Sequence, residues 1–293
     1  MKNNYKLSVL WAILAAVLYA AGSPFSKILL QYIPPAIMAA LLYLGAGTGM
    51  SLMGAVRDKL SKSPKEQKLS QKEFSYIVGM IVLDIAAPIF LNVGLTMTTS
   101  ANASLLNNFE IVATALIALL LFKETISKKL WFGIMLITLS SIILSFENIS
   151  SFSLSLGSLF VLLACVCWGF ENNCTRMLSQ KDPLQIVVIK GFGSGFGSLM
   201  IAGFAGEHSA GIFYMACALL LGFISYGLSI FFYVYAQREL GAAKTSAYYA
   251  VAPFVGVFFS FLIFKEIPSL SFVAALTIMI AGAYFASSDQ KNN

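Results

Sequence analysis

Charged residues are scarce in this sequence of 293 residues: they make up only 11% of it, whereas 58% of the residues are hydrophobic. Soluble domains contain roughly 25% charged and 45–50% apolar residues. The scarcity of charge excludes a soluble globular protein and predicts an integral membrane protein. The net charge of +6 does not indicate nucleic-acid binding, because the positive residues lie in short connections between apolar segments, where they orient a membrane protein.

Residues that carry metal or redox chemistry are also few. His208 is the only histidine, so a histidine-based metal centre or catalytic triad lacks its parts. The four cysteines all lie in apolar segments, and Cys165 and Cys167 do not have the C-x-x-C spacing of a redox pair. The glycine-rich run at 191–198 does not match G-x-G-x-x-G and follows no strand, which excludes a dinucleotide site. We therefore expect no cofactor, no metal and no enzymatic activity.

What the sequence has instead is long apolar runs. Ten of them are each about as long as the ~20 residues that a helix needs to cross a bilayer. They cover approximately residues 7–30, 34–56, 74–95, 101–122, 130–147, 156–178, 183–203, 211–236, 243–264 and 268–287. No strand-like alternation is present, so we predict helices, whose backbone hydrogen bonds are satisfied internally. The expected fold is an all-α integral membrane protein with ten transmembrane helices.

Lysine and arginine are placed asymmetrically along these runs. If both ends of the chain lie inside, the inner side holds 16 of the 19, with Lys27 and Lys265 near the outer face and Lys190 within a span. This bias predicts a multi-pass protein of the plasma membrane with both termini in the cytoplasm. The only long connection, residues 57–73, is interpreted as a solvated cytoplasmic linker whose basic residues could touch anionic lipid.

The two halves of the chain repeat each other. The Phe-Lys-Glu run at 122–124 aligns with the one at 264–266 at an offset of 142 residues, and the earlier spans align at an offset of 149. The second offset matches Tyr19 with Trp168. Two repeats of five helices must be inverted in the membrane because five is odd, and inverted repeats are typical of secondary transporters.

The repeat divides the chain near residue 147. We expect a first five-helix repeat at 1–147, which includes the 57–73 linker, and a second, inverted five-helix repeat at 148–293. A substrate site is then expected near the membrane midplane, between the two repeats.

Short motifs recur at fixed places in this framework. They are Trp168-Gly169 and Arg176 in the sixth span, Ala252-Pro253 in the ninth, and the two Phe-Lys-Glu runs. With these motifs and two five-helix halves, the chain resembles the EamA-type members of the drug/metabolite transporter superfamily over essentially its whole length. The resemblance implies a secondary active transporter that exports small organic metabolites, such as amino acids or related amine-bearing solutes. It also implies alternating access around a central cavity between the repeats.

The sequence departs from the family pattern at two places. It has Tyr19-Ala20 where Trp-Gly is usual, and Glu110-Ile111 where a proline is expected at the second position. The missing proline predicts a fourth helix that is straighter than the ninth. The added carboxylate points to a feature particular to this protein or its close relatives.

One face of the fourth span is small and polar. Its residues, spaced as on one side of a helix, are Ala103, Asn107, Glu110 and Thr114, aligned with Thr245, Tyr249, Ala252 and Gly256 of the ninth span. We predict that these faces line the central cavity. The alternative is that the polar groups only bridge neighbouring helices, for about 0.6 kcal/mol each. The cavity is favoured because an acidic residue in hydrocarbon costs roughly 2.5–3.5 kcal/mol.

Glu110 has three alternative roles in this scheme. It binds a substrate ammonium group, or it takes up a proton that drives transport. In the third role it pairs permanently with a basic residue, for which Lys190 in the seventh span is the best candidate. Glu124 and Glu266, at the ends of the two aligned helices, are expected to mark the fold rather than the site.

Two more carboxylates lie in apolar spans. Asp84 is in the middle of the third span, four residues before Pro88, and aligns with Tyr226. A functional role is expected for it, with a buried structural pair as the alternative. Glu171 lies nearer the cytoplasmic end of the sixth span, where it could reach the interface or pair with Arg176.

Aromatic and amide side chains complete the candidate site. The further residues predicted to bind substrate or to take part in coupling are Tyr19, Trp168, Asn172, Tyr226, Tyr248 and Tyr249. Ring faces beside carboxylates suit a cationic amine. Simple packing is the alternative for Trp168 and for about half of the tyrosines.

Several functions remain open at this point. Besides metabolite export, the residues fit uptake of a quaternary amine such as choline. A membrane-embedded enzyme and a channel or scaffold are less favoured. Energy must come from a gradient or from exchange, with proton coupling as one option, because no nucleotide-binding motif is present. The expected partners are a small-molecule substrate and membrane lipid, without nucleic acid, and the chain is expected to be a monomer or a homodimer.

Overall fold

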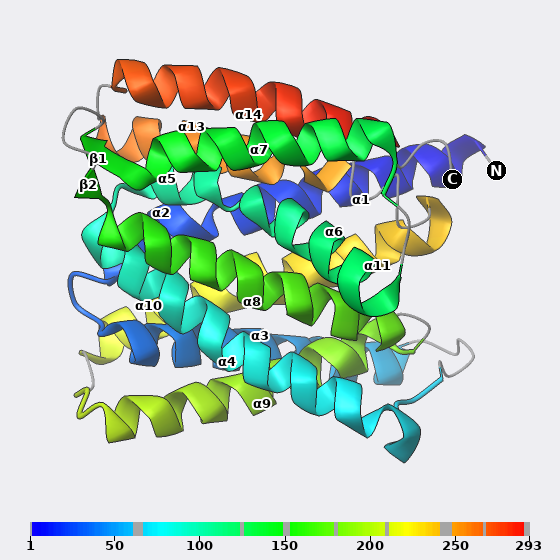
Figure 1. Cartoon of the computed structure of the whole chain (residues 1–293). Coiled ribbons are helices and arrows are strands. Elements are labelled where there is room, and N and C mark those ends of the chain that lie inside the picture. Colours follow the sequence, from blue (N-terminus) through cyan, green and yellow to red (C-terminus); the bar gives the residue numbers. More distant parts are fainter. Residues whose placement is uncertain are drawn as a thin grey trace.

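A computed structural model describes residues 2–60, 67–123, 126–148, 153–178, 181–208, 211–240, 248–265 and 268–289, whose helices form one bundle (Figure 1). The first half of the chain contains α1 (Lys2–Ala20), α2 (Gly22–Leu29), α3 (Pro35–Leu60), α4 (Phe74–Met97), α5 (Ser100–Leu106), α6 (Phe109–Phe122) and α7 (Lys128–Ser145). The second half contains α8 (Leu156–Leu178), α9 (Pro183–Phe204), α10 (Ile212–Gly222), α11 (Ser229–Leu240), α13 (Ala252–Phe264) and α14 (Leu270–Asp289). A short 3₁₀ turn, η1 (Gln71–Glu73), precedes α4, and a π-helical segment, η2 (Phe223–Leu228), joins α10 to α11.

The described residues contain eight helical stretches that are long and apolar enough to cross a membrane. Their bounds agree within about three residues with the first eight apolar segments of the sequence. Two shorter apolar helices follow, Ala252–Phe264 and Leu270–Ala286. The prediction of a helical, multi-pass membrane protein is therefore confirmed. The count of ten stays a prediction, because the ninth segment begins among residues outside the described part.

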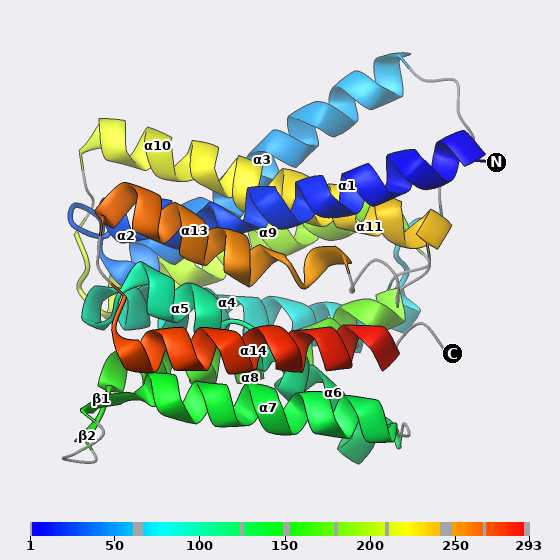
Figure 2. The same cartoon turned by 90° about the horizontal axis from the view of Figure 1, so that it is seen from above.

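A small hairpin was not predicted. Strands β1 (Phe146–Asn148) and β2 (Ser153–Leu154) pair antiparallel between α7 and α8. The hairpin lies at one end of the bundle, whereas α1 begins and α14 ends at the opposite end (Figure 2). The start of the first helix and the end of the last helix therefore lie on the same side of the bundle.

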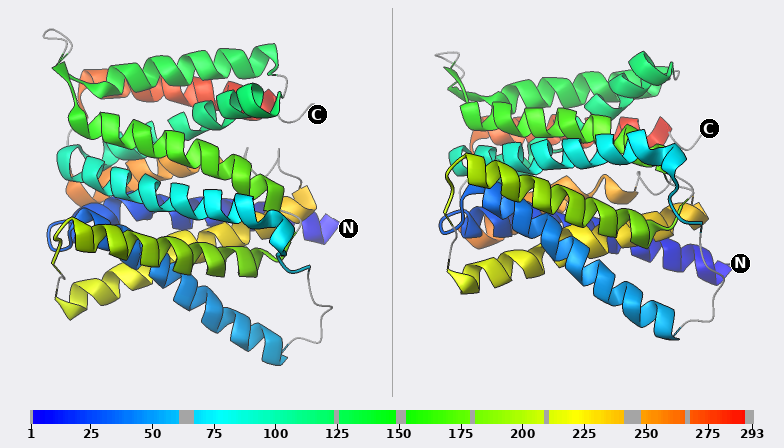
Figure 3. Two further views of the ribbon diagram at one scale, coloured as in Figure 1. Left: turned by 60° about the horizontal axis from the view of Figure 1, so that its bottom comes forward. Right: turned by 90° about the horizontal axis from the view of Figure 1, so that it is seen from below.

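The halves of the chain are packed together along the whole bundle. Helix α4 packs against α8, α1 against α11, α3 against α9, α5 against α13 and α7 against α14. Figure 3 shows α3 (light blue), α4 (cyan) and α9 (yellow-green) together on one face. Every one of these pairs joins an early helix to a late one, so residues far apart in sequence meet throughout the bundle.

Glycines allow some of these helices to approach closely. A Cβ atom on Gly191 of α9 would lie only 2.5 Å from the Cα atom of Gly47 in α3. A Cβ atom on Gly222 would lie 2.0 Å from the carbonyl oxygen of Leu42. The glycine-rich second and seventh spans therefore serve backbone contact between helices, as GxxxG patterns do elsewhere.

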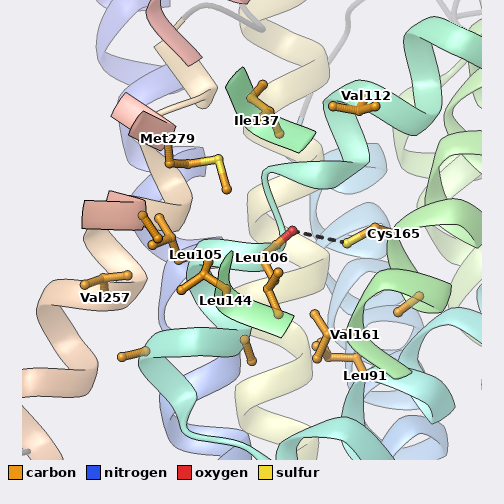
Figure 4. Close-up of a cluster of buried hydrophobic side chains, with 14 of the residues drawn as sticks. Leu91, Leu105, Leu106, Val112, Ile137, Leu144, Val161, Cys165, Val257 and Met279 are labelled. Atoms are coloured by element: carbon orange, nitrogen blue, oxygen red, sulfur yellow. Dashed lines mark hydrogen bonds between the residues drawn. The ribbon is translucent and has the colours of Figure 1, made fainter. Parts of the chain in front are cut away.

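The largest apolar cluster joins both halves of the chain. Figure 4 shows Leu105, Leu106, Ile137, Val161 and Met279 packed together between α5, α7, α8 and α14. Trp168 belongs to this cluster and is only 6% exposed. Its ring is therefore packed among apolar side chains, which agrees with simple packing, the alternative given above for Trp168.

The described ends of the 57–73 linker are docked on the start of α9. Arg57 forms an ion pair with Asp182, with 3.1 Å between Nη2 and Oδ2. The backbone N–H of Asp182 donates to the carbonyl of Gln67 over 2.9 Å. Asp182 also caps α9 by accepting from the N–H of Leu184. The described part of the linker is thus attached to the bundle at these points, while most of residues 67–73 are exposed to solvent.

The fourth span is not one continuous helix, although it lacks the proline; that it is straighter than the ninth stays a prediction. Asn107 and Asn108 form a turn that separates α5 from α6. Here the N–H groups of Glu110 and Ile111 donate to carbonyls three residues back, at 3.1 and 3.0 Å. The side-chain amide of Asn108 donates to the carbonyl of Leu105 over 3.2 Å. Asparagine side chains compete with the backbone in this way, so the span is interrupted without a proline.

A matching interruption occurs in the second half. Residues 250 and 251 form a turn immediately before α13, and residue 250 is the position aligned with Asn108 at the offset of 142. In both halves the irregular backbone lies in the middle of the aligned stretch. In membrane proteins such backbone is tolerated where it is buried in protein or lines a cavity.

Candidate functional site

Asp84, Glu171 and Lys190 form a buried ion cluster at the meeting point of α4, α8 and α9. The Nζ atom of Lys190 lies 3.1 Å from Oδ2 of Asp84 and 2.9 Å from Oε1 of Glu171. Asp84 is 0% exposed, Glu171 2% and Lys190 7%. Ions this deeply buried carry a desolvation cost of several kcal/mol each, which their mutual attraction offsets. We refer to these three residues as the ion triad.

Hydroxyl groups support both carboxylates of the triad. The Tyr43 hydroxyl of α3 donates to Oδ1 of Asp84 over 2.7 Å. The Thr175 hydroxyl, one helical turn after Glu171 on α8, donates to Oε1 of that residue. Oδ2 of Asp84 is the oxygen that lies beside the lysine, so its charge is compensated by this ion pair.

Glu110 lies at the start of α6 and contacts a different set of residues. Its Oε1 atom accepts from the side-chain amide of Asn172 over 2.6 Å, and the same amide lies 3.3 Å from the Thr114 hydroxyl. In the part of the chain that the structure describes, Glu110 has no cationic side chain within ion-pair distance. Its carboxylate is half-buried.

The two polar groups are joined through α8. Glu171 of the triad and Asn172, which holds Glu110, are adjacent in sequence. Helix α8 packs against both α4 and α6. Any shift of this part of α8 therefore affects the triad and the environment of Glu110 together.

A small recess lies beside the interruption of the fourth span. It is lined by Tyr19, Ala20, Ser23, Ser104, Asn107, Ala252, Pro253 and Gly256. A water-sized sphere can occupy only about 10 Å³ of it, which is about the room of one water molecule, whereas ligand pockets are typically ~300–1,000 Å³. Of the two predicted faces, Asn107, Ala252 and Gly256 line this narrow space. Glu110 and Thr114 are not among its lining residues and contact Asn172 of α8.

Tyrosine rings extend from this recess to the triad. The Tyr19 ring lies 5.7 Å from that of Tyr249 and 6.4 Å from that of Tyr226, between centroids. Tyr226 in turn lies edge-on to Tyr43 at 5.2 Å, and Tyr43 holds Asp84. The ring of Tyr233 is 4.9 Å from Tyr249. The rings come from α1, α3, η2, α11 and from residue 249, which precedes the turn before α13.

The structure corrects two of the predicted pairings. Lys190 contacts Asp84 and Glu171, whereas it was the candidate partner of Glu110 in the third of the roles left open for that residue. Glu171 was expected to reach the interface or to pair with Arg176, but it is buried and binds Lys190 and Thr175. The sequence cannot settle such pairings, because they depend on which helices are neighbours.

The remaining candidates are divided between the recess and the packing. Asn107 lines the recess, while Thr114 shares the amide of Asn172 with Glu110. Tyr248 packs with Ala12 and Ala236 away from the recess. Thr245, Glu124 and Glu266 lie outside the described residues.

Sequence reasoning missed three residues of this region. Tyr43 was not singled out because an isolated tyrosine in an apolar span gives no pattern. Ser104 and Ser23 line the recess, but serines are frequent in these spans.

Cys165 places its Sγ atom 3.6 Å from the carbonyl of Leu106, as the dashed line in Figure 4 shows. That carbonyl lies at the interruption, where the N–H of Glu110 donates to Asn107 instead.

Comparison with known proteins identifies the class to which this arrangement belongs. The model of the EamA-like transporter family matches two consecutive stretches of the chain, residues 6–146 and 155–288. These matches cover nearly all of the sequence, so the chain belongs to the EamA-like transporter family. The resemblance inferred from the motifs is confirmed.

Individual relatives agree with this assignment. An uncharacterized transporter of Methanothermobacter thermautotrophicus is 27% identical over 93% of this chain and 83% of its own length. The uncharacterized transporter YyaM of Bacillus subtilis is 23% identical over 88% of this chain and 87% of its own. A crystal structure, described only as that of a protein, covers 97% of both chains with a TM-score of 0.67 and 16% identity, which shows a common fold. The chain is thus a multi-pass membrane transporter.

Proposed function

We propose that this transporter is a secondary active exporter of small organic solutes that carry a cationic amine, amino acids and related metabolites being the expected class. Transport proceeds by alternating access around the recess between the two halves, without a cofactor. The observation that carries this proposal is Glu110. It is a carboxylate held in place by an amide at 2.6 Å, with no cationic partner among the described residues, beside the interruption of its span.

A carboxylate in this position favours a cationic solute. An ionised carboxylate in an apolar span is costly unless it is paired. Asn172 orients the group but does not neutralise it, whereas a substrate ammonium does both. The binding of a cationic amine at Glu110 therefore releases free energy that a neutral or anionic solute cannot.

The arrangement of helices supports alternating access. Aligned helices of the two halves meet in matching pairs: α4 with α8 corresponds to α11 with α1, while α5 faces α13. Both central spans are interrupted at aligned positions, beside the recess. Two halves of similar fold supply two arrangements of near-equal energy, as inverted repeats do in other secondary transporters.

A second candidate function is uptake of a quaternary amine such as choline. The observation that favours it is the group of rings around Tyr19, with centroids 5.7 and 6.4 Å away. Quaternary ammonium groups are bound by aromatic faces rather than by hydrogen bonds. The two candidates share the site and differ in ligand and direction.

The test is solute counterflow in proteoliposomes made with the purified full chain. Labelled amino acids with aliphatic, aromatic and basic side chains, and labelled choline, are offered to vesicles loaded with the unlabelled compound. We expect saturable counterflow of at least one probe, reduced at least tenfold in Glu110→Gln. Glu73→Gln is the matched control, because it removes one negative charge from a site at the surface, where Glu73 contacts Lys181 at 3.4 Å.

Direction is tested with the same vesicles. Right-side-out and inside-out preparations, distinguished by protease access to an added terminal tag, report on which side the solute is released when a gradient is imposed. Net movement toward the side opposite the termini supports export. Counterflow of unchanged rate in Glu110→Gln contradicts the role of Glu110, and movement of choline toward the side of the termini favours the second candidate.

A further inference from the structure

We propose that the ion triad is a proton-binding site that couples transport to a proton gradient. The inference rests on the proposed transport function and assigns its energy source to Asp84, Glu171 and Lys190 rather than to Glu110. In each cycle one proton adds to a carboxylate oxygen of the triad on one side of the membrane. The same O–H bond breaks on the other side, returning the proton to water.

The charge of the triad is the first reason. Two carboxylates share one ammonium group, at 3.1 and 2.9 Å, so the fully ionised triad carries one excess negative charge. A net charge buried to this degree is unfavourable. One added proton makes the triad neutral and leaves a salt bridge with a neutral carboxyl group beside it.

The nature of the bound cation follows from the position of Lys190. Its ammonium group already lies between the carboxylates, so a metal cation that bound both would be repelled by a like charge about 3 Å away. A proton has no such difficulty because it adds to a single oxygen and needs no second ligand. The oxygens that do not make these ion-pair contacts are Oδ1 of Asp84, which accepts from Tyr43, and Oε2 of Glu171.

Other ionisable groups around the triad are few. The groups that interact electrostatically with it are Tyr43 on α3, Tyr226 on η2, Cys174 on α8 and Glu110 on α6. Two further charged residues, Lys27 of α2 and Glu73 of η1, lie near the two ends of α4. Among these neighbours, Glu110 is the only further carboxylate close to the triad. A second negative charge nearby makes uptake of a proton by the triad more favourable still.

The position of the triad explains how a proton could move the protein. Asp84 belongs to the first half of the chain, whereas Glu171 and Lys190 belong to the second. Protonation weakens the attraction across this interface and so favours an arrangement in which α4 separates from α8 and α9. Because Asn172 follows Glu171 directly, such a separation also moves the amide that holds Glu110.

The repeat implies a second interface that corresponds to the one holding the ion triad, and among the residues that the structure describes this second interface does not contain a matching ion cluster. The repeat alignment matches Asp84 with Tyr226 and Glu171 with Gly22, where the start of α2 meets η2. There, a Cβ atom on Gly22 would lie 3.7 Å from Cβ of Ser225, so the interface is made of small and aromatic residues. An ion cluster at one interface alone gives the two access states different proton affinities, as coupling requires.

The experiment compares exchange with accumulation. Asp84→Asn and Glu171→Gln are reconstituted and assayed for counterflow of the amino acid or choline probe without a pH gradient, then for accumulation driven by an imposed pH gradient. A fluorescent pH dye inside the vesicles records proton movement. We expect counterflow within about threefold of wild type and loss of pH-driven accumulation and of substrate-induced proton movement. Ser225→Ala, at the corresponding interface, is the control and should keep both activities.

The outcomes separate this inference from the proposed function. Unchanged pH-driven accumulation in both variants overturns the proton site, and so does accumulation in wild type that follows a sodium gradient and not a proton gradient. If wild type shows no counterflow with any probe, the proposed function fails instead. Proton binding is then still measurable in the detergent-solubilised protein, as an infrared carboxylic-acid signal that appears on acidification. Its loss in Asp84→Asn and Glu171→Gln supports the site, and its persistence in both overturns it.

Discussion

Lys123 and Lys265 have the same left-handed backbone conformation, with φ angles of 54° and 52°. They are 142 residues apart, which is the offset that aligns the two halves of the chain. Each is the residue that ends its helix, α6 or α13. The N–H of Lys123 donates to the carbonyl of Ala118, and that of Lys265 to the carbonyl of Phe261. In the described part of the chain these are the only residues other than glycine with positive φ.

This conformation leads to a prediction about stability. A left-handed backbone costs an L-residue roughly 1–2 kcal/mol, and more when the side chain is β-branched. We expect Lys123→Gly and Lys265→Gly to keep or raise the unfolding temperature, and Lys123→Val and Lys265→Val to lower stability by about 1–2 kcal/mol. The measurement is thermal unfolding in detergent.

Lys129 provides the control because it has helical backbone, in the first turn of α7. There glycine relieves no left-handed conformation, and it is expected to destabilise the protein by at most the roughly 0.5–1 kcal/mol of a glycine in the middle of a helix. If glycine is equally harmful at Lys123, Lys265 and Lys129, the left-handed ends do not control stability.

The recess gives a second prediction, through the contact of Gly256 with Ser104. A Cβ atom on Gly256 would lie 2.9 Å from Oγ and 3.0 Å from Cβ of Ser104. We expect Gly256→Ala to force α13 away from α5, at about 1–3 kcal/mol, and to slow counterflow because Gly256 lines the recess. Adding Ser104→Gly should recover part of both losses, which a double-mutant cycle measures as coupling of about 0.5–3 kcal/mol.

Gly203 is the matched control for this cycle. A Cβ atom there would meet nothing within 4 Å, so Gly203→Ala should leave stability and counterflow nearly unchanged. Strict additivity of Gly256→Ala and Ser104→Gly would show that the two helices do not touch at this point in solution.

Much of the fold could be predicted from the sequence because apolar length decides which segments cross a membrane. The bounds of the first eight spans followed from this alone. Glu110 and Asp84 could also be predicted as site residues, because placing a carboxylate inside an apolar membrane segment costs free energy. This argument does not require any knowledge of their neighbours.

The partners of those residues could not be predicted. Lys190 is close to Asp84 and Glu171 because α4, α8 and α9 meet, and helix periodicity does not say which spans are neighbours. The interruption at Asn107 and Asn108 was missed for a different reason. Proline was taken as the cause of helix breaks, whereas here the side-chain amide of Asn108 competes for a backbone carbonyl.

The ring of Tyr19 distinguishes the two candidate functions. It lies at the recess, between the rings of Tyr226 and Tyr249. If these faces bind a quaternary amine, the ring itself supplies the affinity, because such a cation has no N–H to donate to the hydroxyl. A primary amine depends instead on the carboxylate of Glu110.

We therefore predict that Tyr19→Ala weakens inhibition of transport by choline by about tenfold, since one ring is worth roughly 0.5–2 kcal/mol. Tyr19→Phe should stay within about threefold of wild type, because it keeps the ring. Tyr32→Ala removes a tyrosine that stacks on Tyr214 at 4.0 Å, away from the recess, and serves as control. Equal loss in Tyr19→Phe and Tyr19→Ala would mean that the hydroxyl carries the binding, which favours a hydrogen-bonding amine such as an amino acid over a quaternary one.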